Sequence, residues 1–192
     1  MGGPMRIADV RRIPLRSNVD ARGALTEVFR SEWLAEGGFV QWNAVHSAAD
    51  AVRGVHVHVE HHDYLVVLDG HADVWLRDVR AESPSCDVVE HLELTGLESG
   101  AIFVPAGVAH CVACLTSTWL LVGESRYWST DDELRCRWDD PELGFRIRVD
   151  APMLSAQDRD AGSFAALVAG YRSKGFDGSG APDASAPSTA SR

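Results

Sequence analysis

Histidines are concentrated in one short stretch of this chain. Four of its eight histidines fall between positions 56 and 62, namely His56, His58, His61 and His62. Around the first two, histidine alternates with valine, which is typical of a β-strand because residues two apart point to the same face. His56 and His58 are therefore predicted to project together. Imidazoles held in parallel serve as metal ligands or as acid and base groups.

A further histidine follows a turn sequence. Pro105 and Gly107 precede His110, and a turn of this composition delivers the histidine onto the next strand. Together these residues resemble the two motifs of the cupin superfamily. The first motif has two histidines separated by one residue, followed by an acidic residue and a glycine, here Asp63 and Gly70, and the second is PxGxxH.

The cupin resemblance implies a metal site. It places four side chains at the metal-ligand positions of that superfamily, which are His56, His58, Asp63 and His110. Three imidazoles and one carboxylate suit one divalent transition metal, such as zinc, iron, nickel or manganese, and leave coordination positions for substrate. The alternative is a metal-free barrel whose histidines form hydrogen bonds and transfer protons. The sequence leaves both interpretations open.

Other segments narrow the resemblance. In chain order they are residues 20–23, 27–29, 41–43, 53–56, 78–80 with 83–84, 105–110, 138–141 and 152–158. This set resembles the dTDP-4-dehydrorhamnose 3,5-epimerase family, a branch of the cupin fold, over about residues 7–158. RGxH at 53–56 and SxxD at 155–158 are its more specific parts. Members of the family act on nucleotide-linked 4-keto-6-deoxyhexoses and are usually dimers.

The family resemblance implies a role for each of seven residues. His56 would be the base that removes a proton beside the ketone, and Asp158 the carboxylate that orients its ring. The substrate would be held by Arg22 and Arg53 at its diphosphate, and around its nucleotide by Glu27, Gln41 and Asn43. The plain alternative is that Asp158 caps a turn and the arginines form surface ion pairs.

The chain also departs from the family pattern. His58 stands where the family has a glutamine, and Asp63 where it has a lysine that steadies the enolate. The tyrosine acid of the family falls near Val122, and its Trp-Pro falls at residues 147–148. A metal held by His58, Asp63 and His110 could replace the lysine. His56 cannot be both a metal ligand and the base. If His56 joins the metal, another group must move the proton, and the candidates for that role are His46, His61, His62 and Tyr127.

Most of the chain has the pattern of short strands. Strands are predicted over residues 55–60, 64–68, 72–76, 88–94, 101–104, 109–114 and 119–128, with a hairpin turn at Asp69 and Gly70. Their number and spacing predict an all-β fold, a cupin-type antiparallel jelly-roll barrel. A short helix is predicted over 163–171. We expect one domain over residues 1–172 and a disordered tail over 173–192.

Composition limits the kind of protein. The 192 residues are 45% hydrophobic and carry a net charge of -10, which disfavours general binding to nucleic acid. The apolar runs are too short to cross a membrane, so we expect a cytoplasmic protein without a membrane partner. The four cysteines show no secreted disulfide pattern, and the CxxC pair Cys111 and Cys114 is predicted to be two buried free thiols. Lys174 is the only lysine.

These observations lead to one main hypothesis and two alternatives. The main hypothesis is an isomerase of the nucleotide-sugar epimerase type, which epimerises a dTDP-4-keto-6-deoxyhexose at C3, C5 or both in deoxysugar biosynthesis. One alternative is a metal-dependent cupin oxygenase or isomerase acting on another small molecule. The other is a catalytically inactive cupin that binds a sugar nucleotide. A homodimer is expected because the family's segment corresponding to residues 20–29 reaches the neighbouring subunit's site.

Overall fold

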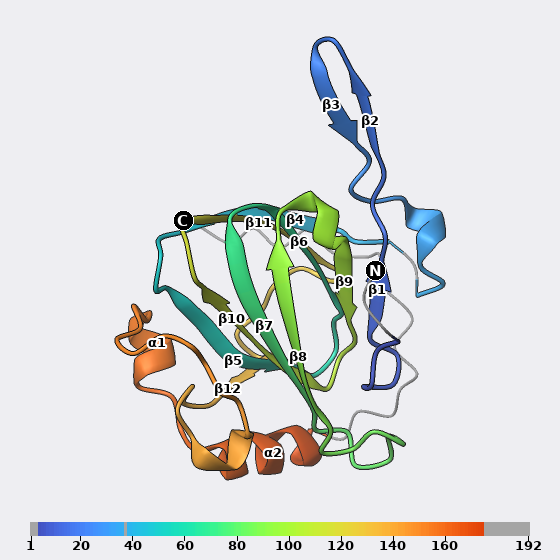
Figure 1. The fold of residues 1–192 in the computed structure, drawn as a ribbon. Coiled ribbons are helices and arrows are strands. Elements are labelled where there is room, and N and C mark those ends of the chain that lie inside the picture. The colour runs from blue at the N-terminus through green and yellow to red at the C-terminus, as the bar shows by residue number, and fades with distance from the viewer. Residues whose placement is uncertain (1–3, 37, 175–192) are drawn as a thin grey trace.

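Strands dominate the computed structural model, which describes residues 4–36 and 38–174 (Figure 1). The strands are β1 (Arg11–Ile13), β2 (Ser17–Asp20), β3 (Gly23–Thr26), β4 (Gln41–Ser47), β5 (Val52–His58), β6 (Asp63–Asp69), β7 (His71–Asp78), β8 (Val89–Thr95), β9 (Ala101–Val104), β10 (Val108–Cys114), β11 (Thr118–Glu124) and β12 (Glu133–Arg135). The helices are α1 (Ala156–Arg159) and α2 (Phe164–Ser173), with 3-10 turns η1 (Ser31–Trp33), η2 (Leu97–Ser99) and η3 (Pro141–Leu143).

Two five-stranded antiparallel sheets face each other. One sheet has the order β1-β9-β6-β11-β4 and the other the order β12-β5-β10-β7-β8. A third, two-stranded sheet is the hairpin of β2 and β3, which projects away from the barrel (Figure 1). The predicted antiparallel jelly roll is confirmed. Among the described residues, no helix has the length and apolarity needed to span a bilayer.

The turn at Asp69 and Gly70 differs from the prediction. β6 pairs with β9 and β11, whereas β7 pairs with β8 and β10, so the expected hairpin is wrong. Gly70 has a φ of 98°, and a Cβ atom there would lie 2.5 Å from the carbonyl oxygen of Ser117. The glycine thus lets the chain cross closely from one sheet to the other. An Asp-Gly signal predicts a tight turn without specifying which strands pair.

Apolar side chains form one core inside the barrel and two outside it, of which the one beside β5 bears on the site. The interior core joins both sheets and includes Leu65, Val74, Leu76, Ile102 and Val112. The outer core lies between the sheet that contains β5 and the C-terminal segment, and includes Val55, Val57, Cys111, Phe164 and Leu167. The valines of β5 therefore point outward. Its histidines point into the barrel, as the alternation predicts.

The cysteines and the C-terminal helix agree with the sequence analysis. All four cysteines are free, and Cys111, Cys114 and Cys136 are buried. The predicted helix is α2, which extends to Ser173 and begins where the hydroxyl of Ser163 accepts a hydrogen bond from a backbone N–H. The expected disordered tail lies outside the described residues from position 175 onward. The single-domain assignment of residues 1–172 stays a prediction.

Candidate active site

An irregularity in β5 positions the two histidines. His56 pairs with His110 of β10, but the next residue of β10, Cys111, pairs with Gly54, so β5 holds one extra residue there. Gly54 has a φ of 113°, and a Cβ atom at this position would lie 2.7 Å from the carbonyl oxygen of His110. Glycine is therefore required before the histidines. The bulge sets the register that directs His56 into the barrel.

A short hydrogen bond joins His56 to Asp158. His56 Nε2 lies 2.7 Å from Asp158 Oδ1. The side chain of Ser155 caps α1 by accepting a hydrogen bond from the backbone N–H of Asp158 at 3.0 Å, which fixes that residue. Burial opposes ionisation of Asp158, but the contacts with His56 and with Arg135 outweigh it and lower its pKa to about 2. Arg135 Nη1 also lies 3.1 Å from the same nitrogen, but the contact with the ionised carboxylate, which only accepts hydrogen bonds, is shorter, so we assign Nε2 as the donor and the lone pair to Nδ1.

Two residues of β12 complete this arrangement and were missed by the sequence analysis. Arg135 stands opposite His56 in the strand pairing and donates to Asp158 Oδ1 at 2.9 Å. Its guanidinium also pairs with Glu133, whose carboxylate lies 4.0 Å from His56 Nδ1. Only a prediction of strand β12 beside β5 could have revealed them.

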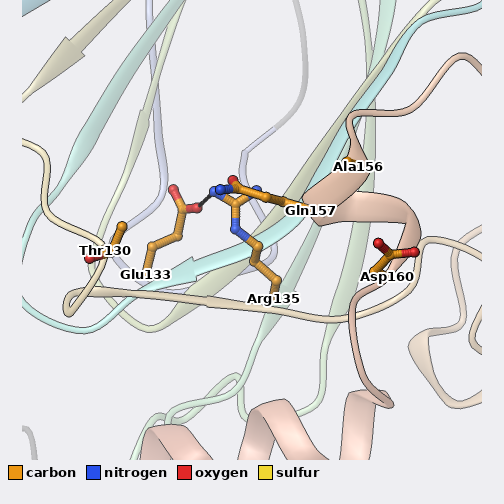
Figure 2. Close-up of a pocket in the computed structure, with 6 residues that line it drawn as sticks. All are labelled: Thr130, Glu133, Arg135, Ala156, Gln157 and Asp160. Atoms are coloured by element: carbon orange, nitrogen blue, oxygen red, sulfur yellow. Dashed lines mark ion pairs between the residues drawn. The ribbon is translucent and has the colours of Figure 1, made fainter. Parts of the chain in front are cut away.

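A solvent-facing pocket of about 400 Å³ is lined in part by Glu133 and Arg135, which contact His56, whereas neither His56 nor Asp158 lines it. Its lining residues are Thr130, Glu133, Arg135, Ala156, Gln157 and Asp160 (Figure 2). Figure 2 shows the ion pair between Arg135 and Glu133 at this pocket, with Gln157 of α1 as a further lining residue. Arg135 therefore lines the pocket and also contacts Glu133 and Asp158.

A second group of ionisable side chains lies deeper in the barrel. Asp63 Oδ2 is 3.2 Å from His58 Nε2 and 3.3 Å from His110 Nε2. His110 Nδ1 lies 3.2 Å from the carbonyl oxygen of Val108 and donates to it, so the lone pair of Nε2 faces Asp63. Burial lowers the pKa of His110 to about 4, which keeps its ring neutral. These three residues could hold a metal ion.

The structure does not bring His56 into that group. Its ring centroid is 6.2 Å from that of His110, and its Nε2 is engaged by Asp158. The predicted four-ligand set is thus divided between a histidine and carboxylate pair and a cluster of three side chains. This arrangement separates a group that can accept a proton from groups that can bind a cation.

His61 also touches the buried cluster. Its Nε2 lies 3.4 Å from Asp63 Oδ1, and its Nδ1 contacts Asp132. Burial opposes its protonation, but the contacts with Asp132 and Asp63 outweigh burial and raise its pKa to about 10. His61 is therefore an imidazolium between two carboxylates. The other expected substitutes lie elsewhere: His46 stacks on Trp119, His62 contacts Phe103, and Tyr127 is exposed.

The expected substrate-binding residues fall into two groups. Asn43 is on β4 and donates from Nδ2 to Glu124 Oε1 at 2.9 Å, and the side chain of Gln41 contacts Asn43 at 3.4 Å. Arg53 is held by the hydroxyl of Ser47 at 2.7 Å. Burial is the main cause that raises the pKa of Glu124. All these residues belong to the barrel.

Arg22 and Glu27 lie away from the barrel. Arg22 is in the turn of the projecting hairpin and pairs with Asp20 at 2.6 Å. Glu27 follows β3 and pairs with Arg30 at 2.6 Å. Within one subunit the structure does not bring either residue to His56, because the hairpin extends outward (Figure 1).

The model of a known family, described as dTDP-4-dehydrorhamnose 3,5-epimerase, matches residues 4–166. The chain belongs to this family. The dTDP-4-dehydrorhamnose 3,5-epimerase of Sinorhizobium fredii is 31% identical over 179 residues, which cover 88% of this chain and 91% of that protein. The enzyme of the same name from Pseudomonas aeruginosa is 28% identical and covers 84% of this chain and 94% of its own length.

Solved structures support the same family. The dTDP-4-dehydrorhamnose 3,5-epimerase of Bacillus anthracis, with TDP and PPi bound, has a TM-score of 0.77 and 26% identity, covering 83% of this chain and 97% of that one. ChmJ, a 3'-monoepimerase from Streptomyces bikiniensis in complex with dTDP-quinovose, has a TM-score of 0.78 and covers 90% of each chain, but its 24% identity supports the fold alone. The family, the cupin-type fold and the isomerase class predicted from the sequence are confirmed.

Proposed function

We propose that this epimerase-family chain acts on a dTDP-4-keto-6-deoxyhexose in deoxysugar biosynthesis and inverts C3, C5 or both. The hydrogen bond of 2.7 Å between His56 and Asp158 carries this proposal. It leaves Nδ1 of the imidazole as a base, and Glu133 and Arg135 beside this histidine also line a pocket of about 400 Å³. A carbon acid beside a ketone needs such a base to lose its proton.

The residues around His56 suit proton abstraction. When Nδ1 takes the proton from the carbon beside the ketone, the electron pair of the broken C–H bond forms an enolate, and the ring becomes an imidazolium. Asp158 stabilises that positive charge through Nε2. Arg135 donates a hydrogen bond to the same carboxylate oxygen at 2.9 Å. Asp158 therefore stays ionised and oriented while the proton moves.

The substrate class follows from family membership and from what relatives bind. The Bacillus anthracis structure contains TDP, and that of the Legionella pneumophila enzyme contains dTDP-4-keto-L-rhamnose. In this chain Arg53 would bind the diphosphate, while Gln41 and Asn43 would contact the nucleotide. No nucleic acid or membrane partner is part of the proposal.

The chain would work as a cytoplasmic homodimer. The β2–β3 hairpin exposes 76% of Val19 and 64% of Leu25, and an exposed apolar hairpin suits burial against a second subunit. In such a dimer, Arg22 and Glu27 would reach the partner's site. Light scattering at micromolar concentration and fractionation of producing cells test the oligomeric state and the location.

Turnover of the proposed substrate tests the function. Purified protein is incubated with dTDP-4-keto-6-deoxyglucose, the keto group is reduced chemically, and the configuration at C3 and C5 is read by NMR. We expect an inverted centre in the product. Binding of dTDP by calorimetry without inversion or exchange at either carbon would contradict the proposal and favour an inactive sugar-nucleotide-binding cupin.

A divalent metal is the second part of the proposal. Three donor groups fit such an ion, the carboxylate of Asp63 and the Nε2 atoms of His58 and His110 that face it. His58 Nδ1 is buried and has no hydrogen-bond partner among the described residues. When bound, the ion would polarise the ketone oxygen and stabilise the enolate as a Lewis acid. His56 would stay free to act as the base.

Elemental analysis tests the metal. Protein purified without a histidine tag should contain about one transition metal per chain, because imidazole and carboxylate suit such ions. His58→Gln should lower that occupancy, whereas His62→Gln, which alters a histidine outside the cluster, should not. If metal-free protein exchanged substrate protons at the normal rate, the proposed role of the metal would be contradicted. Bound metal without any dTDP binding would favour a metal-dependent oxygenase or isomerase for another small molecule.

A further inference from the structure

One tryptophan contacts an edge strand of each five-stranded sheet. β4 is an outermost strand of one sheet, and β12 is an outermost strand of the other. Trp128 lies in the segment between β11 and β12. Its backbone N–H donates to Gln41 Oε1 of β4 at 3.1 Å, and its indole Nε1 donates to Glu133 Oε2 of β12 at 3.2 Å. A single residue therefore joins the two edge strands.

The two partners of Trp128 belong to different parts of the site. The side chain of Gln41 also contacts that of Asn43 at 3.4 Å, and both are proposed contacts of the nucleotide. Glu133 Oε2 lies 4.0 Å from Nδ1 of His56, the atom assigned as the base. This inference rests on the proposed function, in which Gln41 contacts the nucleotide and His56 removes the proton. Trp128 therefore connects the nucleotide end of the site with the base.

The carboxylate of Glu133 is held at both of its oxygens. Its side chain is only 6% exposed. Oε1 pairs with the guanidinium of Arg135, and Oε2 accepts the hydrogen bond from the indole of Trp128. Within the part of the chain that the structure describes, no other group donates to Oε2. Because a buried carboxylate needs partners to replace water, loss of the indole N–H would free this oxygen to move.

The position of Glu133 matters for the proton transfer. When His56 Nδ1 takes the proton from the substrate, positive charge develops on the imidazole ring. A carboxylate that is already held 4.0 Å from this nitrogen stabilises the charge without having to rearrange during the reaction. Trp128 acts on the reaction only through this carboxylate.

We propose that Trp128 is a positioning residue, which holds Glu133 beside His56 through its indole N–H and holds Gln41 through its backbone N–H. The two contacts can be separated, because a substitution of the side chain leaves the backbone N–H in place. Loss of the indole N–H should therefore slow the chemical step and leave nucleotide binding intact.

Trp128→Phe tests this split. Phenylalanine keeps an aromatic ring and the backbone N–H but has no indole donor. We expect kcat for inversion of the 4-keto sugar nucleotide to fall about 10-fold, the order expected for loss of one hydrogen bond to a charged group. The Kd for dTDP, measured by calorimetry, should stay unchanged, whereas a loop residue with only a structural role would not lower kcat alone.

A matched control and a double variant guard against indirect effects. Trp119 is 45% exposed, compared with 44% for Trp128, and it stacks on His46, so Trp119→Phe should leave kcat unchanged. In a Glu133→Ala background, Trp128→Phe should lower kcat no further, because the indole N–H has already lost its acceptor. The melting temperature of each variant is measured to show that the fold is intact.

NMR tests the contact without turnover. In ¹⁵N-labelled protein, the indole N–H resonance of Trp128 is assigned by its absence from Trp128→Phe. We expect this resonance to shift in Glu133→Ala, which removes its acceptor, and to stay in place in Trp119→Phe. An unshifted resonance in folded Glu133→Ala would overturn the inference.

The outcomes distinguish this inference from the proposed function. Wild-type kcat in folded Trp128→Phe would overturn the inference alone, and so would an equal loss of kcat from Trp128→Phe with and without Glu133. Wild-type protein that neither exchanges nor inverts the substrate would instead overturn the proposed function, and the inference with it.

Discussion

The chemistry of His56 depends on what each of its ring nitrogens meets. Nε2 donates to Asp158 at 2.7 Å, and Nδ1 lies 4.0 Å from the carboxylate of Glu133. The pKa of Asp158, about 2, keeps that carboxylate ionised throughout the neutral range. A fixed negative charge on one side of the ring therefore selects the tautomer and supports the imidazolium that forms during catalysis.

Asp158→Asn removes that charge while keeping the shape of the side chain. We expect kcat to fall by about 100-fold to 10,000-fold, because the amide can hold the wrong tautomer and does not stabilise the imidazolium. KM should change little, since Asp158 is buried behind the histidine. Steady-state kinetics on the 4-keto sugar nucleotide measure both constants. An unchanged kcat would show that the carboxylate of Asp158 has no part in catalysis.

Among the elements, β5 has the strictest local requirement. Gly54 combines a φ of 113° with an approach of 2.7 Å between its hypothetical Cβ and the carbonyl oxygen of His110. Residues with a side chain rarely adopt such a φ, and β10 leaves no room for a Cβ atom at this position. The glycine of RGxH is therefore more than a part of the motif, because the path of β5 requires it.

Gly54→Ala tests this requirement. We expect the free energy of unfolding to fall by about 1–3 kcal/mol from backbone strain, with a further loss from the clash with β10. The displaced strand should also lower kcat, because His56 lies two residues beyond. Gly38→Ala is a suitable control, since nothing lies within 4 Å of a Cβ atom there. Equal stability of the two variants in urea unfolding would contradict the account.

The end of β7 depends on a buried carboxylate. Asp78 is fully buried and accepts hydrogen bonds from Arg80 Nε at 2.8 Å and from the hydroxyls of Ser83 and Ser85 at 2.6 Å each. Burial opposes its ionisation, but these donors outweigh burial and lower its pKa. The carboxylate thus connects β7 to the following loop.

The pH dependence of stability should reflect Asp78. Because its folded pKa is lowered, its stabilisation is present above the unfolded value of about 3.9 and is lost as the pH falls through the folded value. Asp78→Asn should cost about 3–5 kcal/mol at neutral pH, since it leaves Arg80 without its buried partner. The difference from the wild type should narrow below about pH 4. Denaturant unfolding at several pH values measures it, and a constant difference would contradict the account.

For the whole molecule, the sequence was informative about strands and less so about their pairing. Alternation along the chain revealed β5 and β10, whereas β9 was predicted as a short strand without alternation, since its four residues are all apolar. The Asp69-Gly70 turn misled, since whether β6 and β7 share a sheet depends on partners distant in the chain. Short strand β12 lacks a pattern long enough to detect. Arg135 and Glu133 were therefore missed, although they lie beside His56.

The assembly should share its site residues between subunits. Arg22 is on the projecting hairpin, whereas His56 is inside the barrel, so each site of a dimer would use both chains. Arg22→Ala and His56→Asn should each be inactive alone. Mixing them should restore up to about one quarter of the wild-type activity, the share expected for one intact site in half of the dimers at random exchange. Absence of recovery in mixtures shown to contain heterodimers would place Arg22 outside the partner's site.

Proton exchange at the sugar ring tests the central claim most directly. Wild-type protein and His56→Asn are incubated with dTDP-4-keto-6-deoxyglucose in deuterated water, and NMR follows C3 and C5. The proposed function predicts deuterium at C3, C5 or both with the wild type, and a loss of at least about 100-fold in the exchange rate with His56→Asn. No exchange by the wild type with or without added metal, or equal exchange by the variant, would contradict it.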